Sequence, residues 1–134
     1  MTKLNIKRVN VKETKHSSSR FYIGRANKSY GLLKSELANP FIIGKDGDRE
    51  EVVQKYKRWL WEQVKEGLAQ KANSAWEELK FLKRYSKELQ QSRDEGYLCI
   101  EPLTLACWCK ESEKCHGDVV IDCLNWMNRN NLGE

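Results

Sequence analysis

Residues 107–118 constrain the fold of this chain more than any other stretch, because three of its five cysteines and one of its two histidines lie there. An apolar run at 103–106 precedes the stretch, and another at 119–121 follows it. This order predicts a strand, a tight loop and a helix. Alternate residues of a strand point to the same side of a sheet, so we expect Cys107 and Cys109 to face the same way.

The predicted helix begins where this loop ends. We expect its first turn to carry Cys115, His116, Gly117 and Asp118. A helix N-terminus has unpaired N–H groups and a partial positive charge, which favour thiolates and bound anions. The stretch therefore predicts soft ligands beside a helix end that suits an anion.

Three kinds of site fit these residues. The first is a zinc site, whose four ligands of the right type are Cys107, Cys109, Cys115 and His116. The last two are adjacent in sequence, and adjacent side chains rarely converge on one ion. The second is a catalytic thiol, in which Cys109 or Cys115 is the thiolate and His116 the base or proton donor, oriented by Asp118.

The third is a phosphate site formed by His116 and the free N–H groups around Gly117, with the cysteines shaping the pocket. Each residue taken alone also has a structural explanation, such as a helix cap for Asp118. The density of rare residue types makes a purely structural role for the whole stretch the weaker interpretation.

Composition places the chain among folded proteins of one domain. It has 134 residues, of which 40% are hydrophobic and 32% charged, and its net charge of +5 is compatible with a polyanionic partner. No stretch resembles a membrane-spanning segment or a signal peptide, so we expect no membrane partner and a cytoplasmic location. A reducing compartment favours metal ligation, catalysis or burial over disulfides for the cysteines.

The remainder of the chain alternates short strands with helices. Strands are predicted at 4–11 and 21–23, with a polar loop containing His16 between them. Apolar residues at spacings of three and four predict helices at about 49–67, capped by Asp48, and about 74–91. The charges of the second helix, Lys80, Lys83, Arg84 and Lys87, are expected on a solvated face.

These elements predict an α/β fold: residues 1–134 form a single domain, a small, mainly parallel sheet is flanked by helices, and a helical insertion lies at about 68–95. Ligands of such sheets bind where the carboxyl ends of strands meet loops and helix N-termini. Polar residues expected at such ends, and therefore candidates for ligand binding, are Gly24, Arg25, Asn39, Lys45, Arg49 and Gly117.

Four motifs resemble those of a family of phages and bacteria known as domain of unknown function 4326. The motifs are Tyr-Ile-Gly-Arg at 22–25, Asn-Pro-Phe at 39–41, Cys-Trp-Cys at 107–109 and Cys-His-Gly-Asp at 115–118. The resemblance implies a compact α/β domain in a bacterial cell or a phage-infected host cell, and it implies no activity. The polar residues that it implies are shared are Gly24, Arg25, Asn39, Arg49, Cys109, Cys115, His116, Gly117 and Asp118.

Two functions follow as expectations, and whether either involves catalysis stays open. The first is a domain that binds a nucleotide or another phosphate-bearing ligand, as a hydrolase or transferase of nucleotide or nucleic-acid metabolism would. Arg25 and Arg49 would hold the anion, Asn39 would orient it, and His116 with Asp118 would do acid/base work near Cys109. The alternative is a non-catalytic module stabilised by zinc, which binds nucleic acid or a protein partner. The added helix also makes a homodimer an expectation.

Overall fold

Three strands and three long helices make up the computed structural model, which describes residues 3–12, 19–96, 101–110 and 112–133. The strands are β1 (Ile6–Asn10), β2 (Arg20–Tyr22) and β3 (Leu103–Cys107). The helices are α1 (Arg49–Leu68), α2 (Ser74–Asp94) and α3 (His116–Arg129), and a short 3-10 helix, η1, covers Lys28–Tyr30. Most of the predicted loop that contains His16 lies outside the described residues.

The sheet is parallel throughout, with the strand order β1-β3-β2. β3 is the central strand, and Leu103, Leu105 and Ala106 in it are fully buried. Central strands of parallel sheets are covered on both sides and are therefore apolar along their whole length. The predicted α/β fold with a small parallel sheet in one domain is confirmed.

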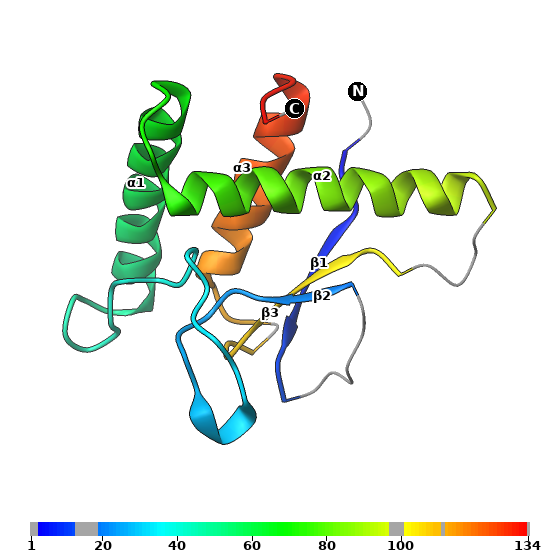
Figure 1. Cartoon of the computed structure of the whole chain (residues 1–134). Coiled ribbons are helices and arrows are strands. Elements are labelled where there is room, and N and C mark those ends of the chain that lie inside the picture. Colours follow the sequence, from blue (N-terminus) through cyan, green and yellow to red (C-terminus); the bar gives the residue numbers. More distant parts are fainter. Residues whose placement is uncertain (1–2, 13–18, 97–100, 111, 134) are drawn as a thin grey trace.

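One hydrophobic core joins the sheet to all three helices. Leu103, Leu105 and Cys107, which alternate along β3, belong to the same buried cluster as Tyr56 of α1 and Leu124 of α3. Figure 1 shows α1 and α3 side by side, with α2 crossing them. The helices therefore share the sheet face to which Cys107 points.

Helix starts follow the predicted capping chemistry. The Asp48 carboxylate accepts a hydrogen bond from the Glu51 backbone N–H, and the Glu51 side chain accepts one from the Asp48 N–H, which makes a capping box. The Asn73 side chain caps α2 with a single hydrogen bond, which it accepts from the Trp76 N–H. The predicted cap at Asp48 is confirmed.

The prediction for Lys83 is wrong, because this lysine is fully buried. Its ammonium donates a 2.6 Å hydrogen bond to the carbonyl oxygen of Leu132. Lys83 lies one turn after buried Leu79 on the core side of α2, so its helical position decided its burial. A carbonyl supplied by the C-terminal segment satisfies the charged head inside the protein.

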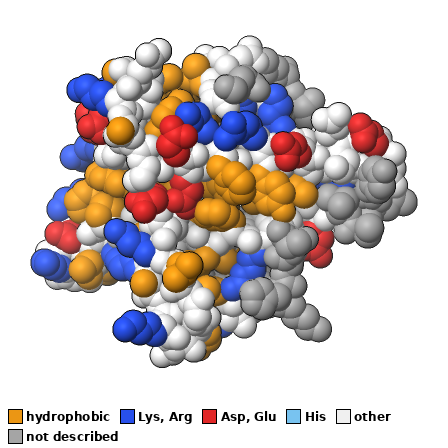
Figure 2. All heavy atoms as spheres, viewed as in Figure 1, with side chains coloured by type: hydrophobic (Ala, Val, Ile, Leu, Met, Phe, Trp, Pro, Cys, Tyr) orange, Lys and Arg blue, Asp and Glu red, His pale blue; other side chains and the backbone are white. Residues whose placement is uncertain are grey.

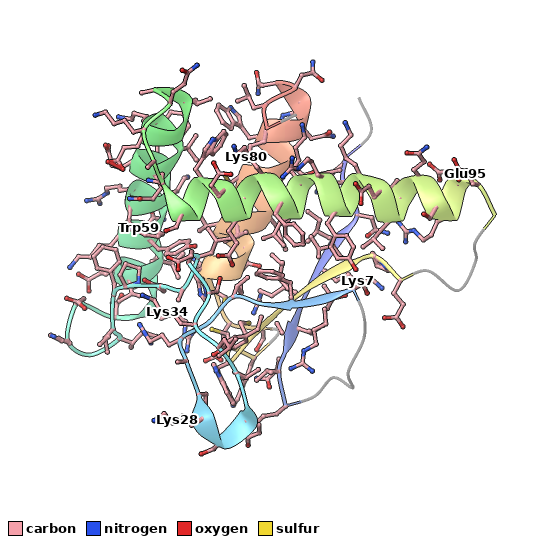
Figure 3. All side chains as sticks on the ribbon, in the orientation of Figure 1. Lys7, Lys28, Lys34, Trp59, Lys80 and Glu95 are labelled. Atoms are coloured by element: carbon pink, nitrogen blue, oxygen red, sulfur yellow. The ribbon has the colours of Figure 1, made fainter. Side chains whose placement is uncertain are left out.

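The outer surface is mixed in character. On the face shown in Figure 2, hydrophobic side chains form separate patches between charged ones. Lys28, on η1, lies at the end of the molecule away from the helices and points outward (Figure 3). Within the described parts of the chain, no helix has the length and apolar character needed to cross a membrane.

Candidate functional site

A cavity of about 490 Å³ lies at the carboxyl ends of β2 and β3, beside the first turns of α1 and α3. Its polar lining consists of Arg25, Asn27, Asn39, Arg49, Lys114 and His116, together with three cysteines, Cys107, Cys109 and Cys115. Its apolar lining consists of Tyr22, Phe41, Ile42, Ile43, Val52, Val53 and Trp108. This is the edge at which parallel sheets bind ligands.

Three thiols converge in the wall of this cavity. The sulfurs of Cys107, Cys109 and Cys115 all lie within 4.8 Å of one another. Cys107 ends β3, Cys109 follows two residues later, and Cys115 is the N-cap of α3. The strand and the helix therefore fix two of the sulfurs. As a group, the three could hold a metal ion.

Arg8, on β1, ties the loop between β3 and α3 to the sheet. Its guanidinium lies 3.7 Å from the Cys107 sulfur and donates hydrogen bonds to the carbonyl oxygens of Glu113 (2.9 Å) and Lys110 (3.4 Å). The same group forms a 2.9 Å ion pair with Asp118 on α3. One buried cation therefore fixes both ends of the loop that carries the thiols.

The pKa values of two of these thiols are shifted in opposite directions. Hydrogen bonds from Cys109 and Cys115, with a further one from Arg8, lower the pKa of Cys107 far below the usual thiol value. The hydrogen bonds that Cys115 makes with Cys107 and Cys109, together with burial, raise the pKa of Cys115. The Arg8 pKa rises, because the hydrogen bond to Cys107 and the nearby negative charges outweigh a burial effect that would lower it. Negative charge in the group is therefore favoured at Cys107, beside the Arg8 guanidinium, and disfavoured at Cys115.

Arg49 approaches the thiols from α1. Its Nη1 atom lies 3.2 Å from the Cys109 sulfur and 3.1 Å from the carbonyl oxygen of Lys114. Its Nη2 atom forms a 3.1 Å ion pair with Glu113. The predicted anion-binding arginine thus lines the cavity with its guanidinium already directed at a sulfur.

His116 lies on the wall next to the thiols, held by contacts on both ring nitrogens. Its Nε2 atom is 2.8 Å from the carbonyl oxygen of Ile23, and its Nδ1 atom is 3.6 Å from the Cys115 sulfur. A carbonyl can only accept, so Nε2 carries the proton and Nδ1 has the free lone pair. The ring also meets the edge of buried Tyr56. Burial lowers the His116 pKa, which keeps the ring neutral near pH 7.

Arg25 shapes the mouth of the cavity. Its Nη2 atom donates to the carbonyl oxygens of Asn39 (2.7 Å) and Phe41 (2.8 Å). The Asn39 side chain accepts a hydrogen bond from the Phe41 N–H. A side chain at Gly24 would collide with the Tyr22 ring, so glycine is required beside this arginine. Arg25 and Asn39 thus hold the Asn-Pro-Phe turn against the end of β2.

An aromatic group continues the wall. The Trp108 indole N–H donates a 2.7 Å hydrogen bond to the Tyr22 hydroxyl, which donates in turn to the Arg25 carbonyl oxygen at 2.6 Å. The Tyr30 ring packs edge-on against Trp108, with 5.0 Å between ring centroids. These bonds hold Trp108 in one orientation at the cavity.

The structure separates the remaining predicted residues from the cavity. Lys45 is exposed and is not part of the lining. Asp118 binds Arg8 and completes the capping box of α3 through the Cys115 N–H. Gly117 is buried against Arg8 and Ile23, and its N–H is directed at the Cys115 sulfur. The backbone groups around Gly117 therefore serve the cap.

Sequence reasoning missed Arg8 and Tyr56. Arg8 follows Leu4 and Ile6 at intervals of two, so it occupies the face of β1 that these apolar residues mark as buried. The sequence signal that could have identified Arg8 was a charged residue at a position of the strand where alternation predicts a buried side chain. The pattern of α1 placed Tyr56 in the core, but no pattern indicated its contact with His116.

Comparison with known proteins yields a family and no activity. No curated protein and no solved structure matches the chain. The model of one protein family, described as a domain of unknown function (DUF4326), matches residues 6–126, which include every strand of the sheet, α1, α2 and the cysteine cluster. The chain therefore belongs to the DUF4326 family of domains of unknown function.

Proposed function

We propose that this domain binds a small phosphate-bearing molecule, such as a nucleotide, in the cavity at the end of the sheet, beside a zinc ion held by Cys107, Cys109 and Cys115. One observation carries the proposal. The cavity lining combines three cations with three thiols, and among the described residues it includes no carboxylate. A cavity of about 490 Å³ falls within the size range of small-molecule sites.

The three cationic side chains that line the cavity differ in whether a carboxylate already pairs with them. Arg49 pairs with Glu113, and Lys114 lies 3.3 Å from Glu50. Arg25 donates only to carbonyl oxygens, and no ion pair within the described residues includes it. Its charge is therefore available to an anionic ligand. Guanidinium groups suit phosphate because they donate in pairs from one plane.

The apolar lining supports a ligand with a flat organic part. Trp108 and Phe41 present aromatic surface to the cavity, and hydrogen bonding through Tyr22 holds Trp108 in place. Ile42 and Ile43 line the same cavity although each is nearly half exposed. Apolar walls with a few directed polar groups are typical of nucleotide and cofactor sites.

Zinc is the metal that best suits the thiol group. It binds thiolates at about 2.3 Å, which separates sulfurs of a tetrahedral site by about 3.8 Å. The sulfurs already lie within 4.8 Å of one another, so they need to move by about 1 Å at most to share an ion. Soft ligands of this kind favour zinc over hard cations such as magnesium.

A binding experiment tests the proposal. The zinc-loaded protein is titrated by calorimetry with inorganic phosphate and a panel of nucleoside mono-, di- and triphosphates, and its metal content is measured by mass spectrometry. We expect about one zinc per chain and binding by at least one nucleotide, weakened about tenfold or more in Arg25→Gln and Lys114→Gln. Lys28→Gln is the matched control, because Lys28 is exposed and lies outside the cavity.

Two results would contradict the proposal. One is the absence of a heat of binding with every phosphate compound. The other is equal weakening by all three charge substitutions, which would indicate general attraction of anions. Circular dichroism of each variant establishes that the fold persists, which matters for Arg25 because it also holds the Asn39 and Phe41 carbonyls.

One observation favours the alternative, a zinc-stabilised module that binds nucleic acid or a protein. The thiols come from the end of β3 and the start of α3, so an ion between them would lock two elements of the core together. This alternative predicts that chelation lowers the melting temperature strongly and that no small phosphate binds. The same titration therefore separates the two functions.

A further inference from the structure

The thiol cluster offers a metal only three ligands. The described His, Cys, Asp and Glu side chains whose ligand atoms lie within 4.8 Å of one another there are Cys107, Cys109 and Cys115, and His116 is not among them. The His116 ring donates through Nε2 to the Ile23 carbonyl oxygen. Zinc takes four ligands, and a site with three protein ligands keeps its fourth position for water or substrate.

We infer that the zinc ion has an open fourth position that faces the cavity, and that an anionic oxygen of the ligand's phosphate displaces water from it. This inference rests on the proposed function and makes the metal part of the ligand site. All three cysteines are among the lining residues of the cavity; Cys107 and Cys115 are each 1% exposed and Cys109 is partly exposed, so an ion held by their sulfurs would lie at the cavity wall.

The charges around the sulfurs support an anion at this position. Zinc with three thiolates carries a net charge of −1, which by itself would repel a phosphate. Arg49 lies 3.2 Å from the Cys109 sulfur, and Arg8 lies 3.7 Å from the Cys107 sulfur. Hydrogen bonds from guanidinium groups withdraw charge from thiolates, and Arg25 adds a cation without a carboxylate partner within the described residues.

Two carboxylates near the cluster are already paired with arginines. Asp118 is bound to Arg8 and is half exposed, and Glu113 is bound to Arg49. Neither belongs to the cavity lining. The cavity lining therefore includes the Arg25 and Arg49 side chains and neither of these carboxylates.

His116 is the rival for the fourth position. Its Nδ1 atom has a free lone pair and lies 3.6 Å from the Cys115 sulfur, so a rotation of the ring could bring it to the metal. That closed site would have no position for a ligand and would act only on stability. If the inference holds, binding of an anion changes the fourth ligand of the metal. If the rival holds, loss of His116 changes it.

Cobalt substitution tests the inference on the protein of residues 1–134. Co²⁺ replaces zinc in thiolate sites, and its thiolate charge-transfer band and visible bands report ligand type and coordination number. We expect inorganic phosphate to shift the visible bands saturably while the charge-transfer band stays, and we expect His116→Ala to keep both sets of bands. Cys123→Ser is the matched control, because Cys123 lies on α3 outside the thiol cluster.

Two outcomes would overturn the inference. If phosphate leaves the visible bands unchanged and His116→Ala changes them, the histidine occupies the fourth position. If the wild-type protein shows no thiolate charge-transfer band, the cysteines do not hold a metal. Calorimetry of the metal-free protein separates this failure from failure of the proposed function, since phosphate or nucleotide binding without metal would leave the cavity as a ligand site.

Discussion

Arg8 and Asp118 lie 110 positions apart in the sequence, and the Nε atom of Arg8 donates a 2.9 Å hydrogen bond to the Asp118 carboxylate. The Arg8 side chain is only 9% exposed, and Asp118 is 51% exposed. The pair joins the first strand to the last helix across the thiol cluster. Stability of the cluster therefore depends on a residue of the N-terminal strand.

Replacement of Arg8 by glutamine is expected to lower the free energy of unfolding by about 2 kcal/mol, because the loop loses its hydrogen bonds and Asp118 loses its partner. The exposure of Asp118 limits the loss. Urea unfolding measures it. Lys65→Gln, which breaks an exposed pair with Glu62, is the control and should cost about 0.5 kcal/mol or less. Equal losses in the two variants would show that Arg8 does not hold the loop.

Gly117→Ala tests the close packing of α3 against β1. A Cβ atom at this position would lie 2.8 Å from Cδ of Arg8 and 3.1 Å from Cδ1 of Ile23. We expect the Arg8 side chain to be displaced, at a cost of about 1 kcal/mol or more. A double-mutant cycle measures the cause, because Gly117→Ala should cost less in the Arg8→Gln background. Additive losses would contradict the proposed contact.

The sequence predicted most of the fold because its elements carry strong local signals. The spacing of apolar residues placed α1 to within one residue at its C-terminal end, and the acidic residue before it is the observed cap. The apolar run before Cys107 predicted the central strand. Lys83 shows the limit of such reasoning. Its spacing from Leu79 marked a buried position, but spacing could not show that the Leu132 carbonyl, 49 residues away in sequence, accepts a hydrogen bond from the buried ammonium.

The sequence identified most residues of the site, but it did not predict how their side chains are arranged. The density of cysteines identified the cluster, yet spacing alone could not show that three sulfurs converge while His116 turns to the Ile23 carbonyl. Such contacts depend on how the strand ends and loops pack. Arg25 and Asn39 were predicted to hold a ligand, and the structure adds a role for both in holding the loop that forms the cavity mouth.

The next prediction concerns the hydrogen bond that Tyr56, the ring beside His116, makes within the core. The Tyr56 hydroxyl is buried and donates a 2.7 Å hydrogen bond to the Leu37 carbonyl oxygen. Tyr56→Phe leaves that carbonyl without this partner, so we expect a loss of about 1–2 kcal/mol in the free energy of unfolding. Tyr30→Phe is the control, because Tyr30 is 54% exposed, and it should change stability by about 0.5 kcal/mol at most. A Tyr56→Phe variant as stable as the wild type would contradict this hydrogen bond.

The last prediction concerns the reactivity of Cys123, a half-buried thiol on α3. Burial, with a smaller effect from the Asp122 charge, raises the pKa of this thiol to about 12. Only the thiolate reacts with iodoacetamide, so alkylation of the native protein should rise about tenfold per pH unit from about pH 8 to pH 10 without levelling off. In urea the rate should level off above about pH 8.5, the ordinary thiol value. Because the neutral thiol is favoured in the folded state, ionisation opposes folding as pH rises above that value. Peptide mass spectrometry resolves Cys123 from the other cysteines, and a native rate that levels off near pH 9 would contradict the raised pKa.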